Sequence, residues 1–127
     1  MIIADTDVLI DFLGGRDPIA GRIALELERG DLKTTAITRF ELLSGARSSR
    51  QLTAVQKLLD AIPTLVLDTP AADRAAEVRR TLERQGEAIG MGDSLITGIV
   101  LEQKGILLTR NRRHFEQVPG LHLGHLS

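Results

Sequence analysis

The sequence predicts an α/β fold with a central parallel sheet of four to five strands flanked by helices. Short apolar runs bounded by turn residues alternate with segments in which apolar residues recur every three to four positions. Strands that alternate with helices favour a parallel sheet joined by right-handed crossovers. No repeat, linker or low-complexity segment divides the 127 residues, so we expect a single domain over residues 1–127.

The strands are predicted from short apolar runs, and the helices from their periodicity and their end signals. The expected strands are residues 1–5, 33–36, 64–67, 106–109 and 121–123. The expected helices are residues 6–13, 18–29, 38–45, 50–61, 70–85 and 93–104, with a helical turn over residues 111–116.

Turn and capping residues predict where the first strand and the first two helices begin and end. The opening run is apolar until its fifth residue, which is typical of a buried strand. Thr6 is suited to cap the helix that follows, and Gly14 and Gly15 end that helix. The second helix opens at Pro18 and closes at Gly30, because glycine accepts the backbone conformation of a helix end.

The later helices follow from the same signals. Thr38 is suited to start the third helix, and Pro70 suits the start of the fifth because its missing N–H would be unpaired there. The inward face of the fourth helix is expected to comprise Leu52, Val55, Leu58 and Leu59. The helix opened by Asp93 is apolar on nearly all sides, so we expect it to be buried.

Composition limits the class of protein. The chain has no cysteine, which excludes disulfides and thiolate metal ligands and fits a cytoplasmic protein. No apolar stretch approaches the roughly 20 residues of a membrane span, and acids interrupt the N-terminal apolar run, unlike in a signal peptide. A net charge of −1 gives no overall attraction to nucleic acid, and only three aromatic residues argue against a base-stacking surface.

Three acids, Asp5, Glu41 and Asp93, are expected at strand ends or helix N-termini. In a parallel sheet these places face the carboxyl edge, where open α/β folds bind ligands. Each acid also has a structural interpretation. Asp5 and Asp93 are suitable N-caps, and Glu41 fits a capping box with Thr38.

Together the three acids predict a metal site. Carboxylates about 5 Å apart repel by roughly 3 kcal/mol per pair at an effective dielectric near 20, so three would cost on the order of 10 kcal/mol. That cost is comparable to the stability of a whole domain. A divalent cation removes it, and oxygen ligands without cysteine favour Mg²⁺ or Mn²⁺.

Other polar residues are expected near the same edge. A secondary set comprises Thr6, Asp7, Thr109 and Asn111, of which Asn111 also suits a helix N-cap. A basic cluster of Arg110, Arg112 and Arg113 fits either a solvated helix face or contacts with phosphates. The three histidines, His114, His122 and His125, match no standard metal-ligand spacing.

Four segments occur in register along nearly the whole chain. They are MIIADTDVLIDFL at the start, TAITRFELLSGA near residue 40, GMGDSLITGIV near residue 93 and ILLTRNRRHFEQVPGL near the end. These segments resemble a PIN domain, and more closely the VapC-type toxins of bacterial and archaeal toxin–antitoxin modules. The resemblance implies a PIN-like three-layer fold.

The resemblance also implies a Mg²⁺- or Mn²⁺-dependent endoribonuclease. Such toxins form homodimers and are inhibited by a small VapB-type antitoxin. The antitoxin also binds DNA, and the toxin would be bound to DNA only through it. The resemblance places the catalytic and metal-binding acids on Asp5, Glu41 and Asp93, and the contacts with RNA phosphates on the arginine cluster. Asp5 and Asp93 would anchor the ion, Glu41 would complete its shell directly or through water, and activated water would attack the scissile phosphate.

The sequence departs from the family pattern at one place. Many members carry another acid after the fourth strand, where this chain offers Asn111 and His114. Whether one or two ions bind therefore stays open. In the family a small uncharged polar residue is commoner at the position of Asp7. The carboxylate of Asp7 is therefore an additional negative charge and a candidate to replace the missing acid.

Two alternative functions are considered. A PIN-like domain short of one acid can lose catalysis and keep only partner binding. Asp5-Thr6-Asp7 and Gly92-Asp93 also resemble motifs of haloacid-dehalogenase-type phosphatases, although Leu9 and Thr97 depart from those motifs.

Overall fold

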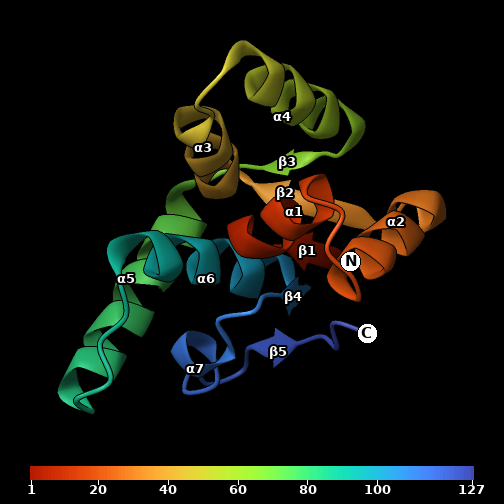
Figure 1. Cartoon of the computed structure of the whole chain (residues 1–127). Helices are drawn as coiled ribbons and strands as arrows, with labels where there is room; N and C mark the ends of the chain where they lie inside the picture. Colours follow the sequence, from red (N-terminus) through yellow and green to blue (C-terminus); the bar gives the residue numbers. More distant parts are fainter.

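The computed structural model describes residues 1–127 and contains a five-stranded parallel sheet flanked by helices (Figure 1). The strands are β1 (Ile2–Ala4), β2 (Leu32–Thr35), β3 (Thr64–Leu65), β4 (Ile106–Leu108) and β5 (His122–Leu123). Their order in the sheet is β3-β2-β1-β4-β5, and every pairing is parallel. The predicted parallel sheet is confirmed, with β1 at its centre.

Seven helices connect the strands. They are α1 (Thr6–Leu13), α2 (Ile19–Arg29), α3 (Ala36–Gly45), α4 (Ser49–Ala61), α5 (Thr69–Arg84), α6 (Met91–Gln103) and α7 (Arg112–Phe115). In Figure 1, α5 and α6 lie side by side, and α3 and α4 lie together beyond the β3 edge. None of the helices combines the length and the hydrophobicity that a membrane span requires.

The side chains of β1 divide the core into two parts. Ile2 and Ala4 belong to a cluster with apolar residues of α1, α2 and α4, whereas Ile3 belongs to a cluster with α6 and α7. This division follows from the alternation of side chains between the two faces of a strand. On the second face α6 packs closely against α5 at Gly98, where a Cβ atom would collide with the backbone of Ala71 and Ala75. The outcome is a sheet between two helical layers.

Two predicted helix starts are wrong by two residues. The start of α1 at Thr6 is as predicted, but the cap of that helix is Asp5, which is extended and accepts from the Thr6 N–H. Thr35 caps α3 by accepting from the Thr38 N–H, so α3 begins at Ala36 and the predicted start, Thr38, is buried inside that helix. Asp93 lies in the first turn of α6, which begins two residues earlier. In α1 and α3 the last extended residue after the strand is the cap, and residue preference alone does not show where that residue lies.

Other boundaries differ by one or two residues. β2 begins one residue earlier than predicted, at Leu32. β3 ends at Leu65, and Val66 is 63% exposed because β3 is an edge strand that pairs on one side only. Leu52, predicted to point inward on α4, is exposed, since Val55, Leu58 and Leu59 supply the buried face of that helix. The middle of α6, between Ser94 and Val100, is largely buried as predicted, whereas Met91, Glu102 and Gln103 at its ends are exposed.

Candidate active site

The carboxyl ends of β1 and β4 bring Asp5 and Thr109 together. The Asp5 N–H donates to the carbonyl of Leu108 at 2.9 Å, and the Thr109 hydroxyl donates to Oδ2 of Asp5 at 2.7 Å. Both residues are buried. Because β1 and β4 are adjacent and parallel, residues that are far apart in the chain meet at one edge of the sheet.

Asp5 carries an electrostatically costly charge. Burial, which leaves the residue only 3% exposed, raises its pKa from 3.8 to about 6. The negative charges of Asp7 and Asp93 raise this pKa further, whereas the hydrogen bonds from Thr109 and from the Thr6 N–H lower it. The charged form of Asp5 would therefore be favoured by a cation at this edge.

Asp7 lies on the first turn of α1, beside the same threonine. Its Oδ2 accepts from the Arg110 N–H at 3.0 Å and lies 3.4 Å from the Thr109 hydroxyl. Its Oδ1 is buried and has no hydrogen-bond partner. Burial raises the pKa of Asp7, although the N–H and the charge of Arg110 act in the opposite direction. A buried oxygen without a partner is uncommon and indicates a place for a ligand.

Thr6 links Glu41 to this edge. The Thr6 hydroxyl donates to Oε1 of Glu41 at 2.7 Å and lies 3.1 Å from the Thr38 hydroxyl. Glu41 therefore reaches from α3 to the start of α1, and the capping-box interpretation with Thr38 is wrong. A Cβ atom at Gly92 would lie 3.8 Å from Oε2 of Glu41, so this carboxylate also faces the start of α6.

Asp93, one residue further along α6, has a histidine partner. Its Oδ2 lies 2.7 Å from Nδ1 of His114, and its side chain is 23% exposed. Spacing along the sequence does not predict the contact between His114 and Asp93, because that contact arises from the placement of α7 against α6. A sequence signal existed nevertheless. This histidine occupies one of the two positions where the family pattern expects another acid.

Asp5, Asp7, Glu41 and Asp93 lie at the same edge of the sheet, but their carboxylates do not surround a common point. No group of three or more histidine, aspartate or glutamate side chains is arranged closely enough to hold a metal ion as it stands. Asp5, Asp7, Glu41 and Asp93 each have a hydroxyl, amide or imidazole partner, and mutual repulsion of carboxylates favours such separate partners. The oxygen donors, with one of them unpartnered, fit the chemistry of a hard divalent cation.

The predicted phosphate-binding arginines differ in their surroundings. Nε of Arg110 lies 3.1 Å from Oδ2 of Asp11, and Nη1 of Arg112 donates to the carbonyl of Gly124 at 2.9 Å. Arg113 is exposed and makes neither an ion pair nor a side-chain hydrogen bond. Of the three arginines, Arg113 is therefore the one whose side chain makes no polar contact within the chain. The side chain of Asn111 is exposed and does not cap α7.

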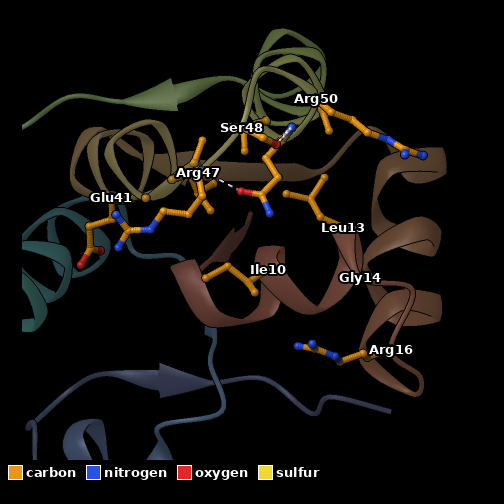
Figure 2. Close-up of a pocket in the computed structure, with 14 residues that line it drawn as sticks. Ile10, Leu13, Gly14, Arg16, Glu41, Arg47, Ser48 and Arg50 are labelled. Atoms are coloured by element: carbon orange, nitrogen blue, oxygen red, sulfur yellow. Dashed lines mark hydrogen bonds between the residues drawn. The ribbon is translucent and has the colours of Figure 1, made fainter.

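A groove of about 660 Å³ lies beside Glu41, between α1, α3 and α4. Figure 2 shows Ile10 and Leu13 of α1 facing the α3–α4 segment across it. Its basic lining residues are Arg16, Arg47 and Arg50. Glu41 is the only acid in the lining, so the groove combines an apolar floor with a positively charged rim.

Comparison with known proteins identifies the family. The model of the PIN domain family matches residues 2–121. The chain belongs to the PIN domain family. This PIN domain is 32% identical over 121 residues to the tRNA(fMet)-specific endonuclease VapC of Shigella flexneri, covering 92% of this chain and 91% of the relative. It is 30% identical over 115 residues to the ribonuclease VapC10 of Mycobacterium tuberculosis, covering 91% and 86%.

A solved structure supports the same assignment. The PIN domain superposes on DNA-bound VapBC from Salmonella typhimurium with a TM-score of 0.87 and 27% identity, over 99% of this chain and 98% of that chain. The predicted family and its three-layer fold are confirmed. Ribonucleases with a PIN domain generally depend on a divalent metal. The phosphatase interpretation is wrong, because the family match covers nearly the whole chain.

Proposed function

We propose that this PIN domain is a cytoplasmic, Mg²⁺- or Mn²⁺-dependent endoribonuclease that acts as the toxin of a toxin–antitoxin pair. The single observation that carries the proposal is the meeting of acids at the carboxyl edge of the sheet, where the buried Asp5 accepts from Thr109 and the neighbouring Asp7 has a buried Oδ1 without a partner. Relatives that are similar in sequence over most of this chain are an endonuclease and a ribonuclease.

The proposed ion site uses the oxygen ligands at this edge. Asp5 and Asp93 would hold the ion, and Glu41 would complete its shell directly or through water. The unpartnered Oδ1 makes Asp7 the candidate for the additional negative charge that Asn111 and His114 do not provide. When bound, the cation polarises the scissile phosphate and lowers the pKa of a water molecule.

Neighbouring side chains hold these acids in position. The Thr109 hydroxyl orients Asp5, the Thr6 hydroxyl orients Glu41, and Nδ1 of His114 orients Asp93. Such partners of metal-binding carboxylates set the direction of the ligand oxygens. Arg113, whose charge is unpaired, attracts the RNA backbone beside the acids.

Cleavage of RNA by the purified protein tests the proposal. In Mg²⁺ we expect internal cleavage of total RNA into products that lack 2′,3′-cyclic phosphates, because the nucleophile is water and not the ribose 2′-hydroxyl. End labelling and cleavage-site mapping after brief incubation measure this outcome. Binding of Mn²⁺ without cleavage of any RNA would instead support the alternative of a catalytically inactive binding module.

We also propose that the groove beside Glu41 is a surface for the antitoxin. The solved relative is a VapBC complex. The apolar floor and the arginine rim of the groove fit a segment that carries apolar and acidic side chains. A segment bound there would cover Glu41 and so restrict access to the acids. Assembly into a homodimer stays a prediction.

Replacement of both Arg47 and Arg50 by glutamate is expected to weaken binding of the antitoxin by about tenfold or more, through loss of charge complementarity. Cleavage of RNA by the free toxin should persist, because neither arginine contacts the proposed ion site. Titration of the antitoxin onto the toxin measures the affinity. Lys57→Glu, on an exposed position of α4 outside the groove, is the control. An unchanged affinity of the double variant would contradict this surface.

A further inference from the structure

Asp11 is a buried carboxylate outside the proposed ion site. It is 3% exposed, although it belongs to the short surface helix α1. Its Oδ1 lies 3.3 Å from Nη1 of Arg16, and its Oδ2 lies 3.1 Å from Nε of Arg110. The two guanidinium groups compensate the buried charge, which would otherwise be strongly unfavourable.

Arg110 is attached to α1 at two points. Asp7 accepts from its backbone N–H at 3.0 Å, while Asp11 pairs with its guanidinium. Asp7 and Asp11 stand four residues apart on α1 and therefore share one face of that helix. The residue before Arg110 is Thr109, whose hydroxyl donates to Asp5. Both threonine and arginine lie beyond the end of β4 at Leu108, where strand pairing no longer holds the backbone.

We propose that Asp11 is a positioning residue of the active site. By holding the Arg110 guanidinium, it keeps the Thr109–Arg110 segment against Asp5 and Asp7 and so fixes the direction of both carboxylates. This inference rests on the proposed nuclease function, but the geometry it describes is measurable without any cleavage. It also assigns the Arg110 guanidinium a structural partner, and the expected effect on kcat distinguishes this role from the predicted contact with phosphate.

The chain offers a matched control for a buried acid between two arginines. Glu26 of α2 is 2% exposed and lies 3.3 Å from both Arg22 and Arg29. It contacts none of the residues of the proposed ion site. Glu26→Gln therefore removes a comparable buried charge and leaves the Thr109–Arg110 segment untouched.

The experiment compares Asp11→Asn with Glu26→Gln. Both are expected to lower the free energy of unfolding, because each leaves arginines with a weaker partner. Only Asp11→Asn should accelerate hydrogen exchange of the Arg110 N–H in the metal-free protein by tenfold or more. Only Asp11→Asn should also weaken Mn²⁺ binding by about tenfold, a typical effect of losing a residue that supports metal ligands. Its kcat should fall with little change in KM, whereas loss of a phosphate contact would raise KM.

Two further variants test the route through Arg110. Arg110→Met should reproduce the effects of Asp11→Asn, and the double variant should be no worse than either single variant. Arg110→Lys keeps the charge and should restore part of the Mn²⁺ affinity. These variants replace an exposed side chain, so they also serve if Asp11→Asn does not fold.

Several outcomes would overturn the inference. One is an Arg110 N–H that exchanges as slowly in Asp11→Asn or Arg110→Met as in the wild type. Others are an equal loss of Mn²⁺ affinity in Glu26→Gln, or effects of Asp11→Asn and Arg110→Met that simply add. A wild-type protein that cleaves no RNA would refute the nuclease proposal alone, because hydrogen exchange would still decide whether Asp11 holds the segment.

Discussion

Asp5→Asn and Asp93→Asn are each expected to reduce cleavage of RNA by on the order of a thousandfold or more, while the protein remains folded. Loss of a residue that only supports a metal ligand typically costs ten- to a hundredfold in affinity or activity, so loss of a ligand itself should cost more. Both substitutions keep the size of the side chain but remove its negative charge. Cleavage rates at matched Mg²⁺ concentration measure the effect.

Asp5→Asn should also show that this residue is placed for activity and not for stability. At neutral pH the shift of the Asp5 pKa from 3.8 to about 6 corresponds to a cost of about 3 kcal/mol for the charged form. Asparagine avoids that cost, so the metal-free variant should be at least as stable as the wild type in urea. Asp68→Asn, which changes the N-cap of α5 away from the site, is the control and should keep full cleavage. Full cleavage by either metal-site variant would refute the assignment.

Removal of divalent metal by a chelator is expected to stop cleavage and to make the stability of the protein fall with rising pH. The folded-state pKa of Asp5 lies above its ordinary value, so the folded protein binds more protons than the unfolded chain between these two values. This contribution to stability is complete below about pH 4 and is lost as the pH rises through about 6, a loss of about 3 kcal/mol by pH 7. The raised pKa of Asp7 acts in the same direction.

Bound metal should remove most of this dependence. An ion present at a hundred times its dissociation constant stabilises the folded state by about 2.7 kcal/mol, which is close to the expected loss. Urea unfolding at several pH values, with and without Mn²⁺, measures both effects, and addition of Mg²⁺ or Mn²⁺ should restore cleavage. Asp5→Asn is the control because it lacks the titrating group. A metal-free wild type whose stability rises from pH 5 to pH 7 relative to Asp5→Asn would contradict this prediction.

The sequence by itself determined the parallel sheet, the order of its elements and the identity of the acids at the carboxyl edge. The apolar run that ends in Asp5 and the glycines that end helices act locally, so residue type and spacing were sufficient. The departure at Asn111 and His114 was also visible in the sequence, as was the arginine cluster that follows β4.

The tertiary structure decided what each of these side chains contacts. Glu41 was compatible with a capping box until its bond to Thr6 placed it across from α1. Asp93 of α6 contacts His114 of α7, and Asp11 of α1 contacts Arg110 beyond the end of β4, so each contact joins separate segments of the chain. Spacing along the chain reports which face of an element a residue occupies. Hydrogen bonds and ion pairs between elements depend on how those faces pack against each other. The separation of two residues in the sequence does not predict that packing.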